Sequence, residues 1–249
     1  MLRTVYVMWL REVRKFLRSP SRIVAALAQP LFYLLALGYG LGGVFKAAGQ
    51  GSYVQFLVPG IVGMTIVFTS IFNGMQVIWD RQFGFMKETL VAPVPRSGIM
   101  LGRTLGGATV STLQGLVVLA LTLAVGFQPH SWVLVAPAIG VMFLVATVYS
   151  ALGIIVASHL SDMQGFQFVV NFLVMPMFFL SGALFPLSDS PLALRAVAAF
   201  DPLSYGVDGM RILLSNVSHF GAAADVTLLS AVAALLLGLG SYRFAKMEA

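Results

Sequence analysis

The chain has 249 residues, of which 59% are hydrophobic and only 10% are charged, and its mean hydropathy is +0.92. Soluble domains carry roughly 25% charged residues, so this composition excludes an ordinary soluble protein and indicates a polytopic membrane protein. The net charge of +6 does not indicate nucleic acid, because the basic residues cluster beside apolar segments, as membrane topology requires. Without cysteine, the chain has no disulfide, no thiolate metal site and no cysteine nucleophile.

Residues 2–18 predict an amphipathic helix. Apolar residues recur at helical spacing, with Trp9 and Tyr6 among them, and charged residues, Glu12 included, fill the other face. Such a helix is expected to lie in the membrane interface. The sequence is compatible with two roles for this helix: anchoring to anionic lipid, and contact with a cytoplasmic partner. The residues that such a partner would meet are Trp9, Arg11, Arg14, Lys15 and Arg18.

Six apolar segments follow, each close to or above the ~20 residues that a membrane span needs. They cover residues 23–45, 54–79, 99–126, 132–157, 165–187 and 223–244. Small residues such as Gly102 and Gly106 predict close helix packing. The sequence therefore predicts an all-α membrane protein with six transmembrane helices, an N-terminal interfacial helix and one domain over residues 1–249.

The connection 80–98, between the second and third segments, is the one long charged island in the apolar part of the chain. Phe83, Phe85, Met86 and Leu90 can project from a short helix there, and Pro93 and Pro95 return the chain to the membrane. Exposed phenylalanines are a liability unless a partner covers them. We therefore expect this loop to dock a soluble protein.

The connection 188–216, before the last segment, is too long for a simple turn. Ser190-Pro191 and Asp201-Pro202 each place a capping residue before a proline, which predicts short helices over 193–200 and 203–214. They are too short to span, so we expect them to lie on or dip into the outer leaflet. Asp208 and Arg211 stand three residues apart and are expected to pair on one helix face.

Basic residues gather on one side of this predicted topology. Twelve of the fifteen Lys and Arg lie before the first segment, in the connection between the second and third or the first turns of the third, or at the C-terminal end of the chain from Arg243 onward. The other side holds Lys46, Arg195 and Arg211. The positive-inside rule then makes both termini cytoplasmic.

Signals for enzymatic chemistry are absent from the sequence. There is no phosphate-binding loop, the three histidines are scattered without metal-ligand spacing, and no serine lies in a nucleophile-elbow context. Polar and aromatic residues within the spans remain as candidates for a substrate pathway, although helix packing is their commoner role. They are Asn73, Gln76, Phe168, Asn171, Phe172 and Met175.

Two blocks of this sequence resemble ABC-2-type permeases, the membrane subunits of bacterial and archaeal ATP-binding-cassette exporters, and most closely the daunorubicin-resistance and nodulation-export branch. The first block comprises Asp80, Arg81, Gly84, Lys87, Glu88, Leu90, Ala92, Pro93 and Arg96. The second comprises Pro176–Phe179, Leu180-Ser181-Gly182, Phe185-Pro186, Pro202–Tyr205 and Asp208–Arg211.

The resemblance implies a transport subunit of the cell inner membrane that is not itself an enzyme. Two permease copies, expected to be a homodimer, would sit over two cytoplasmic ATPase subunits, and ATP and Mg would bind there and not on this chain. The substrate would be an amphipathic drug, lipid or glycolipid-like molecule moving outward. The residues expected to couple to the ATPase are Arg81, Phe83, Gly84, Phe85, Met86, Lys87, Glu88, Leu90 and Arg96. The expected external gate is Phe185, Pro186, Tyr205, Asp208 and Arg211.

Two other classes of function remain open. A membrane scaffold or sensor would use the same loop to dock a soluble protein without transport. An ion-coupled secondary carrier would need charged groups at mid-membrane, and the sequence places its aspartates at segment ends, which counts against it.

Overall fold

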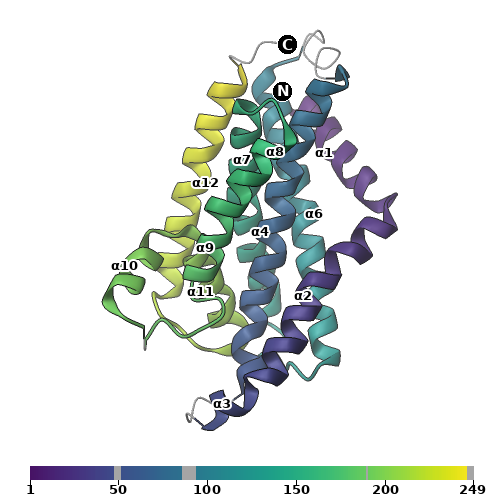
Figure 1. The fold of residues 1–249 in the computed structure, drawn as a ribbon. Coiled ribbons are helices and arrows are strands. Elements are labelled where there is room, and N and C mark those ends of the chain that lie inside the picture. Colours follow the sequence, from purple (N-terminus) through teal and green to yellow (C-terminus); the bar gives the residue numbers. More distant parts are fainter. Residues whose placement is uncertain (48–51, 86–93, 189, 246–249) are drawn as a thin grey trace.

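Long apolar helices run up and down side by side in the computed structural model, which describes residues 1–47, 52–85, 94–188 and 190–245 (Figure 1). No strand occurs among these residues. The helices are α1 (Leu2–Leu17), α2 (Pro20–Gly40), α3 (Gly42–Ala47), α4 (Tyr53–Gln82), α6 (Arg96–Ala124), α7 (Val135–His159), α8 (Met163–Val169), the π-helical turn η1 (Val170–Val174), α9 (Met175–Leu180), α10 (Leu192–Phe200), α11 (Pro202–Ser215) and α12 (Ala222–Ala245).

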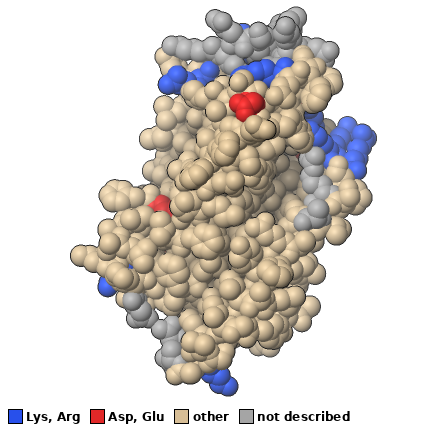
Figure 2. Space-filling model, in the orientation of Figure 1, with Lys and Arg blue, Asp and Glu red and all other residues tan. Residues whose placement is uncertain are grey.

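Five of the six predicted spans are confirmed as helices long and apolar enough to cross a membrane: α4, α6, α7, the run Met163–Leu180 and α12. The first predicted span, 23–45, corresponds to α2, whose apolar stretch Ala26–Gly40 is shorter than the others. A crossing by α2 therefore stays a prediction. The N-terminus and the end of α12 lie at the same end of the bundle (Figure 1). Lys and Arg gather at that end and on α1, above a wide belt that shows no Lys or Arg (Figure 2).

The centre of the bundle is α4, which packs most extensively against α7 and also against α6, α2 and α11. Glycine makes the closest approach possible. A Cβ on Gly74 of α4 would lie 2.3 Å from the carbonyl carbon of Gly153 in α7, so the two backbones touch there. A residue with any side chain at this crossing would push the helices apart.

Helix α1 lies against α6, and one face of it is buried through Met8, Glu12 and Phe16. Gly102 and Gly106 of α6 allow the approach, because a Cβ on either would lie within 2.7 Å of the Cβ of Met8 or Glu12. The close packing expected of these glycines is confirmed. Placing Glu12 on the exposed polar face was wrong, because Glu12 faces the bundle and keeps 8% of its surface exposed.

The fifth predicted span, 165–187, is shorter and less regular than expected. Helical structure ends at Leu180, and α8 and α9 are joined by the π-helical turn η1. Pro176 lies just beyond that turn and cannot donate a backbone hydrogen bond, and its ring crowds the carbonyl four residues earlier. A π-turn is a common way for a helix to absorb such a clash.

The two short helices expected before the last span are present as α10 and α11. Asp201 caps α11 as predicted, since its side chain accepts a hydrogen bond from the Leu203 amide at 2.9 Å. Helix α10 instead begins after Pro191 without a side-chain cap. Their place relative to a membrane stays a prediction.

Candidate functional site

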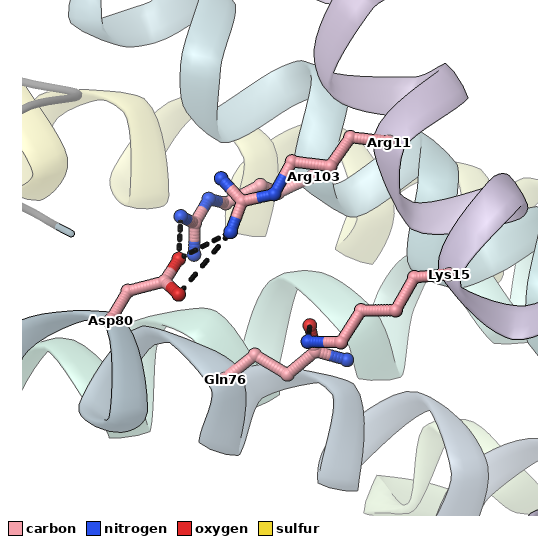
Figure 3. A network of polar contacts seen from close by, with 5 residues as sticks. All are labelled: Arg11, Lys15, Gln76, Asp80 and Arg103. Atoms are coloured by element: carbon pink, nitrogen blue, oxygen red, sulfur yellow. Dashed lines mark hydrogen bonds and ion pairs between the residues drawn. The ribbon is translucent and has the colours of Figure 1, made fainter. Parts of the chain in front are cut away.

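A buried ion cluster joins three helices at the end of the bundle where the chain begins. The Asp80 carboxylate, in the last turn of α4, pairs with Arg103 of α6 and lies 3.1 Å from the Arg11 guanidinium of α1 (Figure 3). The Arg103 side chain is 4% exposed and that of Asp80 is 9%, whereas Arg11 is 38% exposed. The cluster thus has a buried pair at its centre and a more accessible third member.

The local fold explains why these charges meet. Asp80 ends the apolar run of α4, and Arg103 lies two turns inside α6, so the loop between the helices brings them to one level. A carboxylate near a helix C-terminus faces the negative end of the helix dipole, and two guanidinium groups offset that cost. A buried pair costs desolvation but is far worse when one partner is removed.

Two further polar contacts hold α1 on the bundle. The Trp9 indole donates to the Thr109 hydroxyl at 2.9 Å, and the Lys15 ammonium donates to the Gln76 side chain at 2.8 Å. Trp9, Arg11 and Lys15, predicted as partner contacts, therefore bind neighbouring helices of the same chain. Arg14 and Arg18 are exposed.

The first residues of the charged loop after α4 include a hydrogen-bonded arginine and two exposed phenylalanines. Arg81 donates to the carbonyl oxygens of Ser158 and Leu160 at 3.2 Å each, so it binds the C-terminal end of α7. Gly84 has φ +80°, a conformation that favours glycine and turns the chain away from the helix. Phe83 and Phe85 are 70% and 54% exposed.

Other predicted coupling residues divide into two groups. Arg96 is the first residue of α6, at the return of the loop. Met86, Lys87, Glu88 and Leu90 lie outside the described residues.

A chamber of about 370 Å³ lies between α1, α2, α4 and α6. Asn73 and Gln76, two of the predicted pathway residues, line it. The structure does not bring the others to it: Phe168, Asn171 and Phe172 are exposed on the outer side of α8 and η1. Met175 is half-buried beside them at the start of α9. The predicted pathway set is therefore split between an internal chamber and an exposed helix face.

The predicted gate residues lie at the opposite end of the bundle from the ion cluster. The Tyr205 hydroxyl donates to the Ala199 carbonyl at 2.8 Å, and its ring stacks on Phe220. Phe185 and Pro186 are half-buried in the connection after α9.

The predicted pair of Asp208 and Arg211 is wrong, because each binds elsewhere. Asp208 accepts hydrogen bonds from the backbone amides of His219 and Phe220, while Arg211 donates to the Gly182 carbonyl at 3.1 Å and lies 4.0 Å over the Phe56 ring. Burial lowers the pKa of Arg211 to about 10, and nearby Asp208 acts in the opposite direction. Asp208 and Arg211 thus each bind a distant segment of the chain and do not form a surface ion pair with each other.

Asp201, which caps α11, makes the stability of this end of the bundle depend on pH. Burial raises the pKa of its carboxyl from 3.8 to about 7, although the Leu203 amide and the Tyr149 hydroxyl lower it. A raised pKa in the folded state means that the protonated form favours folding. This contribution is fully present below the unfolded pKa and is lost as the pH rises through about 7.

We therefore expect the free energy of unfolding to fall by about 4 kcal/mol between about pH 3 and about pH 8 through this group alone. Asp201→Asn keeps a capping side chain but cannot ionise, so its unfolding midpoint should vary less over that range. Thermal unfolding of both proteins in one detergent, across the pH series, measures the difference. Equal slopes for wild type and variant would contradict the prediction.

Sequence reasoning missed three functional residues: Asp80 and Arg103 as a buried pair, and Glu12 as an inward-facing acid. A signal for the pair was present, because Arg103 falls inside the predicted span 99–126. An arginine within a span requires a carboxylate partner, and Asp80 ends the neighbouring span. No comparable signal marks Glu12. Among the described residues, no group of three or more His, Asp or Glu is placed to hold a metal ion.

Comparison with known proteins identifies the family. The family model for the ABC-2 type transporter matches residues 3–215. Nodulation protein J of Rhizobium leguminosarum bv. trifolii is 29% identical, over 78% of this chain and 74% of its own length. Inner membrane transport permease YadH of Escherichia coli (strain K12) is 28% identical, over 82% and 79%. Putative transport permease ycf38 of Pyropia yezoensis is 31% identical, over 84% and 72%. The chain therefore belongs to the ABC-2 type transporter family and is a multi-pass membrane transport permease.

Proposed function

We propose that this permease is the membrane subunit of an ATP-driven exporter, with both termini in the cytoplasm and ATP hydrolysis on a separate subunit. Family membership over residues 3–215 carries the proposal. Two observations support it: the basic residues gather at one end of the bundle, and the loop at that end presents Phe83 and Phe85.

In this proposal the loop 80–98 receives the motion of the ATPase. Phe85 and Met86 supply an apolar contact, and Lys87 and Glu88 supply charges that set its register. Two ATPase copies would act on two permease copies, and ATP and Mg would bind to the ATPase.

The ion cluster supports such a role, because it binds together the helices on both sides of the loop. Asp80 ends α4 and Arg103 lies near the start of α6, so a force on the loop reaches both helices through one buried pair. Arg11 adds α1 to the same unit. A rigid unit transmits displacement where separate helix ends would bend independently.

The exported substrate in this proposal is amphipathic: a drug, a lipid or a glycolipid-like molecule. In this proposal Asn73 and Gln76 meet the substrate from the chamber, and Phe168, Asn171, Phe172 and the half-buried Met175 meet it from α8, η1 and α9. The outer end around Phe185, Pro186, Tyr205, Asp208 and Arg211 is the proposed gate.

Copurification from the native membrane tests the partner. The tagged chain, extracted in mild detergent, should bring down a stoichiometric protein that carries a phosphate-binding loop. The double variant Phe85→Ala with Glu88→Ala should insert normally but lose at least 90% of that partner, because it removes both the apolar contact and the acid.

Phe200→Ala is the matched control, since Phe200 is 90% exposed and lies on α10 away from the loop. Full retention of the ATPase and of transport by the double variant would refute the coupling role. A scaffold would bind its partner without ATP-stimulated transport. A secondary carrier would transport without the ATPase and would respond to a proton gradient.

A further inference from the structure

The chamber between α1, α2, α4 and α6 is elongated along α4, and its charged side chains, Glu12 and Lys15, both come from α1. Along α4 its lining runs from Trp79 to Met64, which is roughly 22 Å of helix. Its volume of about 370 Å³ lies within the range of roughly 300–1,000 Å³ for sites that bind organic molecules. Phe68, Phe72 and Pro30 line its middle. An elongated apolar ligand with a polar head would match this shape.

The polar end of the chamber lies beside the ion cluster and carries Glu12, Lys15, Asn73 and Gln76. Lys15 donates to Gln76 at 2.8 Å, and the Asn73 amide nitrogen donates to the Gly107 carbonyl at 3.3 Å. Lys15 and Asn73 therefore each donate within the chain, whereas the Gln76 amide nitrogen donates to no described residue. Among the described residues, acceptor capacity remains on the Glu12 carboxylate and on the Asn73 carbonyl.

Glu12 is the exceptional group in this lining. It is 8% exposed, and its carboxylate accepts no hydrogen bond from any described residue. Its carboxylate oxygens are not among the buried atoms that lack a partner, so they keep access to the chamber that Glu12 lines. Glu12 also borders a void of about 10 Å³ that Arg103 and Ser150 share, so one water there is the structural alternative.

We infer that the chamber binds an amphipathic amine. The ammonium group would donate to the Glu12 carboxylate and the Asn73 carbonyl, and the apolar body would lie along Phe68 and Phe72. This inference names the ligand class of the permease proposed above and so rests on that proposal. An anionic amphiphile fits less well, because the Glu12 carboxylate would repel it and Lys15 is already engaged by Gln76.

Equilibrium binding tests the inference without any ATPase. Tritiated dodecylamine is added to the tagged chain in lipid nanodiscs, and specific binding is read by scintillation proximity, with excess unlabelled dodecylamine defining the background. Binding should saturate, and dodecanol and dodecyl sulfate, which share the tail, should compete at least about 10-fold less well, because a hydrogen bond to a charged group discriminates by that much or more.

Glu12→Gln should weaken dodecylamine binding by about 10-fold or more, and Glu12→Asp should retain most of it. Asp201→Asn, which removes a carboxylate from the other end of the bundle, should bind like wild type. Thr69→Trp fills the chamber at mid-length and should abolish specific binding while leaving Glu12 in place.

Three results would overturn the inference: wild-type binding by Glu12→Gln, unchanged binding by Thr69→Trp, or stronger competition by dodecyl sulfate than by the amine. The first would leave Glu12 without a role in amine binding. If Glu12→Gln does not fold, the inference is still tested by Thr69→Trp and by the competition of dodecylamine with dodecanol and dodecyl sulfate. Amine binding without ATP-driven transport would retain the site and reject the proposed function, and transport without amine binding would do the reverse.

Discussion

Asp80→Ala should lower the free energy of unfolding by about 3–5 kcal/mol, the usual cost of breaking a buried ion pair. The reason is Arg103, whose side chain is 4% exposed and would be left charged without its carboxylate. Arg103 cannot lose its proton to relieve the cost, because guanidinium stays charged in proteins. Heating the detergent-solubilised protein and following the folded fraction by size-exclusion chromatography measures the loss.

Two further variants separate the pair from the cluster. Arg11→Ala should cost less than about 1 kcal/mol, because the Arg11 side chain is 38% exposed and solvent screens its charge. Asp80→Leu with Arg103→Met replaces the pair by apolar groups and should recover most of the stability. A loss for Arg11→Ala as large as that for Asp80→Ala would show that the buried pair is not the centre of the cluster.

The positions of the helices could be predicted because a long apolar segment is a strong signal. Five spans and the two short helices before the last span were found in this way. It was harder to predict which face of each helix packs against the rest of the protein. Periodicity marks an apolar face but does not say whether lipid or protein covers it. Residues 2–18 show this: Met8 and Glu12 face α6, while Leu2, Tyr6 and Leu17 are exposed.

Side-chain partners required the tertiary structure. Asp208 and Arg211 have the spacing of a helical ion pair, yet backbone amides and a carbonyl from distant segments bind them instead. The chamber has the same origin, since it combines α1, α2, α4 and α6, which no local pattern links. The buried pair of Asp80 and Arg103 was also missed, although a charge inside an apolar segment is a signal that a partner lies nearby.

Gly74→Ala should be among the most damaging single-methyl substitutions in the chain. Its Cβ would lie 2.3 Å from the carbonyl carbon of Gly153 and 2.4 Å from its oxygen, both backbone atoms that no rotamer change can move. Overpacking of a core costs about 1–3 kcal/mol and sometimes more, and this rigid contact should reach the upper end at about 3 kcal/mol. The same thermal measurement should show a large fall in the unfolding midpoint and in yield from membranes.

Gly140→Ala is the matched control, because Gly140 lies in α7, the same helix as Gly153, with nothing within 4 Å of a built Cβ. There alanine should instead stabilise the helix, by about 0.5–1 kcal/mol, since it removes the conformational freedom of glycine. Gly153→Ala tests the contact from the other side, where the new Cβ would meet the Ile71 carbonyl oxygen at 2.7 Å. Opposite signs for Gly140→Ala and the other two variants would assign the effect to the α4–α7 crossing. A mild effect at all three positions would instead mean that the helices separate easily, and α4 could not then serve as the rigid centre of the permease.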